Sequence, residues 1–359
     1  MIDHHRRCGA PPQESSAALP QIDRFQYSQE ELSLVVPKQY GGLGATKVEA
    51  LEAQFTLARE NLSRAFVLSQ RNAAIGWIVR SKESPLRNDL LERATTEYLA
   101  TQAVSVIAPS SRASDPLVKA SETDRGFLLD GTYPWVTGLS HAQFLVGGAT
   151  LSDGSHALLL VNTDEQNAER THYAKLHALE DSDSWRFEVR QAFISSDRVL
   201  IGPRRDLVTT TEEGRTVAYP PLATSALALG HASKLVELLQ RAERSNPRED
   251  EHPSDLLNIQ IERLKTTMRN LVQDPSQRAV EDLRARSNLL VMSLSQLLLL
   301  ETRGRGFVSG SPIEKAIRES HFFQVWANSE AVEGAVKQAL LSLVVQNLND
   351  LPGQAKAAP

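Results

Sequence analysis

Apolar residues recur at helical spacing through the first part of the chain, over about 28–85. The pattern is broken once, at 35–46, because Pro37 and the Gly41-Gly42 pair do not fit inside a helix. This break predicts a fixed loop between helical segments. The predicted helices cover about 29–34, 47–60, 63–81 and 85–101.

Short apolar runs separated by turn residues replace the helical spacing in the middle of the chain. Asp130-Gly131 predicts a hairpin turn between strands at 127–129 and 135–137, and residues 152–154 predict a second turn. Short strands between two helical regions indicate an all-β middle domain. The predicted strands cover 104–107, 127–129, 135–137, 143–150, 155–161, 185–190 and 192–194.

The last third of the chain returns to long amphipathic helices, predicted over about 219–245, 255–274 and 275–303. Its most apolar run, 289–300, is too short to span a bilayer and is interrupted by serine and glutamine. We therefore expect this run to be a core helix of a globular protein.

Composition limits the classes of function. The 359 residues carry a net charge of −5 with the two signs interleaved, so no basic face predicts binding to nucleic acid or to an acidic membrane surface. The single cysteine, Cys8, has no partner for a disulfide within the chain, which fits a reducing compartment. Residues 1–20 lack the apolar core of a signal peptide. We expect a cytoplasmic protein with no metal site.

The segment 126–142 reads GFLLDGTYPWVTGLSHA. Its order of residues resembles the flavin-contacting segment of the acyl-CoA dehydrogenase family, whose pattern is roughly G-y-x-l-x-G-x-K-x-W-I-T. In that family the Trp-Ile-Thr strand lies against the flavin ring, with the threonine directed at the reactive N5 edge. The resemblance implies that Trp135, Val136 and Thr137 contact a flavin here. Tyr133 stands where the family has lysine.

Other segments resemble the same family. Residues 37–44 match its P-x-x-Y-G-G-L-G motif, and 193–203 are similar to the exit of its β-domain. Residues 107–115 match T-E-P-x-x-G-S-D in part, with Ile107 in place of the threonine, Ser114 in place of the serine and the glycine missing. Without that glycine the backbone approaches a phosphate less freely, which weakens the predicted pyrophosphate contact of this loop.

The longest match covers 303–329 and resembles G-G-x-G-[FY]-x-x-x-x-P-[IV]-E-[KR]-x-x-R-D, followed by Tyr-Glu-Gly-Thr. Arg303 replaces the first glycine, and Glu319 replaces the aspartate. The family's Arg-x-x-Phe-Gly motif, which reaches the FAD adenine of a neighbouring subunit, is missing from 244–252. The resemblance implies FAD as the cofactor, with FMN as the alternative. The implied flavin contacts are Ile107, Ser114, Trp135, Val136, Thr137, Gly304, Gly306 and Ser329.

The resemblance also implies the fold and the assembly. We expect an α+β multidomain chain of acyl-CoA dehydrogenase-like architecture and a homodimer or homotetramer that associates through the C-terminal helices. The expected parts are a disordered leader at 1–24, a trimmed N-terminal helical domain at 25–102, a middle antiparallel β-barrel at 103–210, a C-terminal four-helix bundle at 211–350 and a disordered tail at 351–359.

The family's desaturation of an acyl thioester needs a carboxylate that removes the α-proton while a hydride goes to the flavin. Most members place this glutamate at the position of Ala327 and a minority at the position of Tyr219, so both known positions lack a carboxylate. A phenol titrates near pH 10 and is a poor base. Proximity in sequence offers Glu330, Glu301 and His321 as candidates for a relocated base.

Three functions therefore remain open. The first is a flavin-dependent oxidoreductase that acts on an acyl thioester or similar small substrate with a relocated base. The second is a two-component flavin monooxygenase of the same superfamily, which needs no such base. The third is a non-catalytic scaffold that keeps the fold, as the alanine at 327 and the missing Arg-x-x-Phe-Gly motif suggest.

Overall fold

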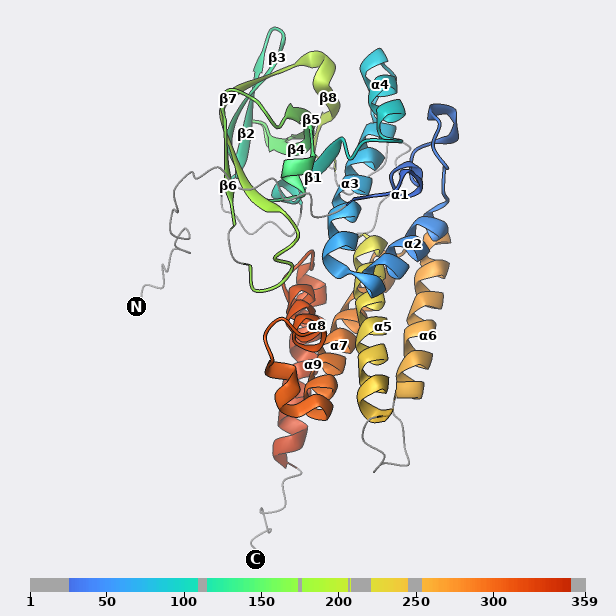
Figure 1. The fold of residues 1–359 in the computed structure, drawn as a ribbon. Helices are drawn as coiled ribbons and strands as arrows, with labels where there is room; N and C mark the ends of the chain where they lie inside the picture. Colours follow the sequence, from blue (N-terminus) through green and yellow to red (C-terminus); the bar gives the residue numbers. More distant parts are fainter. Residues whose placement is uncertain are drawn as a thin grey trace, which may run out of the picture.

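The computed structural model describes residues 26–108, 115–173, 176–205, 207, 221–244 and 254–349. Within these ranges helices come first, then strands, then helices again (Figure 1). The strands lie together at the top left of the view with α1–α4 beside them, and α5–α9 lie below. The predicted order of helical, β and helical regions is confirmed. The predicted domain boundaries stay predictions, and the leader and tail lie outside the described residues.

The N-terminal helices begin at side-chain caps. Ser28 and Thr46 form capping boxes with Glu31 and Glu49. The fourth helix ends at Arg93, eight residues before the predicted end at 101, because the chain turns there and residues 100–103 join the sheet. The elements are α1 (Gln29–Ser33), the 3₁₀ turn η1 (Lys38–Tyr40), α2 (Lys47–Glu60), α3 (Leu62–Arg80) and α4 (Pro85–Arg93).

The strands form one sheet in the order β6-β7-β3-β2-β4-β5-β8, with β1 also paired to β4. Neighbouring strands are antiparallel except for the β1–β4 and β2–β4 pairs, which are parallel. The sheet is therefore largely antiparallel, as predicted. Its strands are β1 (Ala100–Ala103), β2 (Val118–Thr123), β3 (Gly126–Thr137), β4 (Phe144–Thr150), β5 (His156–Asn162), β6 (Ala168–His172), β7 (Ser184–Ser195) and β8 (Val199–Arg204).

The predicted hairpin at Asp130-Gly131 is wrong, because β3 runs straight through both residues. The register between β3 and β7 shifts between Leu129 and Gly131, where Arg190 and Gln191 of β7 stand opposite Asp130 alone, and Gln191 has a φ of 50°. The Gln191 N–H donates to the Asp130 carboxylate at 2.9 Å. A bulge therefore stands where the turn was predicted. Because β7 continues through this bulge, the strands predicted at 185–190 and 192–194 are one strand.

The strand predicted at 104–107 is also wrong. Residues Ser105–Ile107 form a 3₁₀ turn, η2, and the strand β1 lies just before it. The strands predicted at 143–150 and 155–161 are confirmed to within a residue at each end. Three strands were not predicted at all, namely β2, β6 and β8, and β2 and β6 have few buried residues to reveal them.

The predicted C-terminal helices are confirmed where the structure describes them. Gly230 of the first of these helices faces the α2 backbone so closely that an added Cβ would lie 2.3 Å from the Phe55 carbonyl oxygen. The elements are α5 (Leu222–Arg244), α6 (Ser254–Gln273), α7 (Gln277–Thr302), the 3₁₀ turn η5 (Arg303–Phe307), α8 (Pro312–Ser320), the 3₁₀ turn η6 (His321–Gln324) and α9 (Glu330–Asn349).

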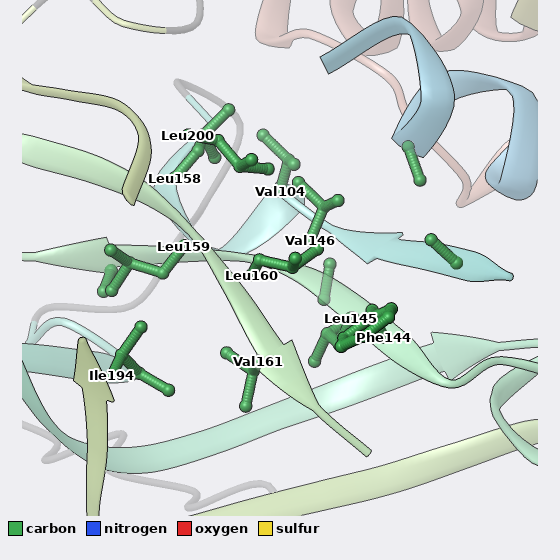
Figure 2. Packing of buried hydrophobic residues seen from close by; sticks show 14 of the residues in the cluster. Val104, Phe144, Leu145, Val146, Leu158, Leu159, Leu160, Val161, Ile194 and Leu200 are labelled. Atoms are coloured by element: carbon green, nitrogen blue, oxygen red, sulfur yellow. The ribbon is translucent and has the colours of Figure 1, made fainter. Parts of the chain in front are cut away.

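Two large hydrophobic cores meet along α3. The first lies within the sheet, where Val146 of β4 lies beside Leu160, its partner on β5 (Figure 2). The second lies among α2 and α5–α8. The C-terminal half of α3 contributes to the sheet core and its N-terminal half to the helical core. This helix therefore fixes the β-region relative to the C-terminal helices.

Candidate functional site

The end of β3 presents an aromatic ring to solvent. The Trp135 side chain is 56% exposed, and its indole stacks on Tyr173 with ring centroids 4.3 Å apart and ring planes 25° apart. The Tyr173 hydroxyl donates to the Pro134 carbonyl, which holds the two rings together. One large aromatic side chain is thus kept at the surface in a fixed orientation, which suits the stacking of a planar ring.

The neighbouring residues of this strand face inward. Val136 is fully buried in the sheet core. Thr137 is 6% exposed, and its hydroxyl lies 3.1 Å from the Ser184 hydroxyl, which is 2.8 Å from that of Ser182. The Thr137 hydroxyl therefore belongs to a buried chain of hydroxyl groups. Contact with a flavin would require either its backbone or a change of rotamer.

One face of α3 brings together three segments that are distant in the sequence. Its side chains contact Gly138 directly after β3, the loop before α9, and α8. Because α3 is packed in both cores, these three segments are held in a fixed arrangement. Val67 contacts Gly138, and the Phe66 ring lies with its centroid 4.8 Å from that of Phe322 and 5.0 Å from that of Trp326. Ser63 Oγ donates to Glu319 Oε1 at 3.3 Å.

Ala327, at the family's usual base position, lies in a loop held from beneath by a buried arginine. Arg284 of α7 is fully buried and donates to the carbonyls of Trp326 at 2.9 Å and Thr224 at 2.6 Å. Asn328 accepts from the Asn288 amide at 3.0 Å. Ala327 itself has a φ of 50°, a left-handed conformation that is uncommon for a residue with a Cβ. The loop is rigidly positioned, and it presents a methyl group at 327.

The residues predicted as relocated bases lie on the C-terminal helices and turns. Glu330 is exposed in the first turn of α9, and Glu301 lies in the last turn of α7. His321 is exposed, and its Nδ1 lies 3.4 Å from Nε2 of His177. Tyr219 and Ser114 lie outside the described residues. The catalytic assignments therefore stay predictions.

A buried carboxyl that the sequence reasoning overlooked lies close to this site. Glu319 of α8 is 5% exposed, and its carboxylate lies 3.9 Å from Lys315 Nζ and accepts from Ser63. Burial raises the pKa of Glu319 to about 7, and the nearby lysine only partly opposes this effect. The one sequence signal was its place in the 303–329 match, where the family has a shorter acid.

Replacing Glu319 with glutamine tests this burial. Because the folded pKa is raised above the ordinary 4.5, the folded protein holds a proton that the unfolded chain loses as the pH rises from about 4.5 to 7. The contribution of Glu319 to the free energy of unfolding should therefore fall as the pH rises through this window, and Glu319→Gln should lack that fall. The free energy of unfolding of Glu319→Gln minus that of wild type should be larger at pH 8 than at pH 4 by on the order of 2 kcal/mol. Urea unfolding at several pH values measures it, and parallel curves for the two proteins would contradict it.

Several predicted flavin contacts have structural roles in the described chain. Ile107 is 7% exposed and packs against Gly148. A Cβ at Gly306 would lie 2.6 Å from Leu299 Cδ1, so close packing with α7 explains this glycine, whereas Gly304 faces open space. Ser329 donates to Glu281 at 2.7 Å and caps α9. All of the flavin contacts, that of Trp135 included, stay predictions.

Among the described residues, no helix is long and apolar enough to cross a membrane. The same residues contain no group of three or more histidine, cysteine, aspartate or glutamate side chains placed to hold a metal ion.

Comparison with known proteins places the chain among flavoprotein folds. No family model matches the sequence. A curated relative, a probable medium-chain specific acyl-CoA dehydrogenase 2 of Caenorhabditis briggsae mitochondria, is 22% identical over 350 residues, which cover 91% of this chain and 84% of the relative.

Solved structures resemble the chain over most of its length. The dibenzothiophene monooxygenase TdsC of Paenibacillus sp. A11-2 superposes with a TM-score of 0.70 at 17% identity and covers 88% of each chain. The butyryl-CoA dehydrogenase of Megasphaera elsdenii superposes with a TM-score of 0.70 at 15% identity and covers 87% of each chain. The chain therefore has the acyl-CoA dehydrogenase-like fold, as its sequence motifs predicted. Proteins named as dehydrogenases and as a monooxygenase share this fold.

Proposed function

We propose that the protein is a flavin-dependent oxidoreductase whose flavin ring lies against Trp135. The half-exposed indole, held flat on Tyr173 at the end of β3, is the observation that carries this proposal. It occupies the position that the family resemblance assigns to the flavin-contacting tryptophan. A bound flavin supplies hydride or electron transfer, while the chain binds and orients it and limits its contact with water.

Two chemistries fit this proposal. Oxidation of an acyl thioester or a similar small acyl substrate is supported by the dehydrogenase relatives, and it requires a base other than residue 327. Monooxygenation is supported by the similarity to TdsC and needs no carboxylate at that position. Monooxygenation is the second candidate function. The observation that supports it is the methyl group at Ala327, in a loop held by the hydrogen bond from Arg284 to the Trp326 carbonyl. FAD is the first candidate cofactor, and FMN, with which TdsC was solved, is the other.

The absorption spectrum of the purified protein, alone and with FAD or FMN in oxidised and reduced form, tests the proposal. Retained oxidised FAD supports acyl-thioester oxidation, and binding of reduced flavin alone supports the monooxygenase. If neither flavin binds in either state, the flavin-dependent function is wrong and the scaffold is favoured.

Replacing Trp135 with alanine should weaken flavin binding about tenfold, because the stacked aromatic surface is lost. Titration of flavin absorbance or fluorescence measures the dissociation constant. Trp77→Ala is the matched control, since Trp77 donates to Gln102 and packs under Arg80 on α3. Equal losses in the two variants would argue against Trp135 as the flavin contact.

The proposed assembly is a homodimer or homotetramer through the C-terminal helices. The second half of α9 supports it, because Leu341, Leu343, Val344 and Val345 are each more than half exposed. We expect a mass of two or four chains in light scattering, and a monomer would contradict it. The cytoplasm remains the proposed location, although the curated relative is named as mitochondrial.

A further inference from the structure

The connection between β6 and β7 reaches from the sheet down to α8 (Figure 1). Its described residues 176–183, here called the strap, place Leu179 in the helical core as the apolar anchor. Charged side chains and histidine rings make further contacts between the strap and α8 or η6. They are Asp181 with Lys315 Nζ at 3.1 Å, Glu180 with Arg318 at 3.5 Å, the His177 carbonyl accepting from Arg318, and the His177 ring with the His321 ring.

The two imidazole rings meet edge to edge. Their planes differ by 9°, their centroids are 5.7 Å apart, and Nδ1 of His321 lies 3.4 Å from Nε2 of His177. A hydrogen bond between these nitrogens requires that one ring keep a lone pair, so at least one ring must be neutral. Two imidazolium rings carry only donors, and their like charges repel at this distance.

Other charged groups surround the pair. On α8, the Glu314 carboxylate faces His177 and is held by Arg318 at 2.6 Å, and Lys315 lies between Asp181 and Glu319. Glu319, whose pKa burial raises to about 7, loses its negative charge early as the pH falls.

Beneath α8, His231 of α5 is bonded to the Ala316 carbonyl at 2.9 Å. Burial lowers the pKa of His231 to about 4, so it stays neutral through this range. Loss of the Glu319 charge removes its repulsion of Asp181 in the strap, so the repulsion that develops on acidification lies at the His177–His321 pair itself.

The strap is continuous with the end of β3. Its last residue, Asp183, accepts a hydrogen bond from Gly138 N at 2.8 Å through its carbonyl and from Ser140 N at 2.8 Å through its carboxylate. The next residue, Ser184, pairs with Thr137. The strap therefore joins the His177–His321 contact through the chain to the segment that carries Trp135 and Thr137.

We propose that the strap is a pH-operated latch. It docks on α8 while the His177–His321 pair holds at most one charge, and it releases when both rings are charged. Release loosens the chain beside Gly138 and opens the end of β3. Histidine is the side chain whose charge most commonly changes between about pH 5 and 8, so a comparison across that interval tests the latch. The latch depends on the contacts of the strap and not on the proposed flavin.

Hydrogen–deuterium exchange of the full-length protein without flavin tests the latch. Exchange of the amides in 176–183, corrected for the pH dependence of the chemical rate, should be at least tenfold faster at pH 5.5 than at pH 7.5. In His321→Gln this difference should shrink below threefold, because the amide side chain stays neutral at both pH values. His321→Lys, which carries a fixed charge, should keep a pH difference of at least tenfold, because the charge on His177 then decides whether the pair holds one charge or two.

His156→Gln is the matched control, because His156 of β5 bonds to Thr150 away from the strap, and this variant should keep the wild-type difference. His177→Gln repeats the test from the other ring if His321→Gln does not fold. The latch is wrong if wild-type exchange in the strap does not depend on pH, or if the neutral variants keep the full pH difference.

Discussion

Replacing Arg284 with methionine should lower the free energy of unfolding by about 3 kcal/mol. The arginine is fully buried and donates to the carbonyls of Thr224 and Trp326, so its loss leaves two carbonyls without these donors in a site closed to water. The same change releases the loop that holds Ala327 at a φ of 50°. Urea unfolding followed by circular dichroism measures the loss.

Arg286→Met is the matched control on the same helix. The Arg286 side chain is 65% exposed and pairs with Asp282 at 2.9 Å, a surface ion pair that contributes little to stability. Its substitution should change the free energy of unfolding by less than about 0.5 kcal/mol. If the two variants lose similar amounts of unfolding free energy, the burial of Arg284 is not the reason for its contribution to stability.

The second large effect is expected where α2 and α5 cross. In Gly230→Ala the new Cβ would lie 2.3 Å from the Phe55 carbonyl oxygen and 2.8 Å from Ala58 Cβ, so the two helices must move apart. We expect a net loss of about 2 kcal/mol, because overpacking exceeds the gain of about 1 kcal/mol in helix propensity. Thermal or urea unfolding of the variant measures it.

The same substitution at Gly334 should have the opposite sign. Gly334 lies in α9, and an added Cβ would meet nothing within 4 Å. Gly334→Ala should therefore stabilise the protein by about 0.5–1 kcal/mol. If both alanine variants stabilise the protein, the close approach of α2 and α5 does not prevent a side chain at position 230.

Local signals accounted for most of the helices. The 3.6-residue spacing, the capping residues and the prolines act over a few neighbouring residues, and the helices predicted over 47–60, 255–274 and 275–303 begin and end close to the observed bounds. The order of motifs along the chain predicted the acyl-CoA dehydrogenase-like fold. It also drew attention to Trp135, whose exposed ring the structure then revealed.

The sequence by itself thus determined the order of helical, β and helical regions, the fold and the loss of a carboxylate at residue 327. Tertiary structure decided that Asp130-Gly131 continues a strand and does not form a turn, because β3 pairs there with β2 on one side and with β7 on the other. It also decided that Trp135 stacks on Tyr173, that Glu319 is buried and that His177 meets His321. These facts depend on contacts between residues far apart in the chain, which no local pattern of residues records.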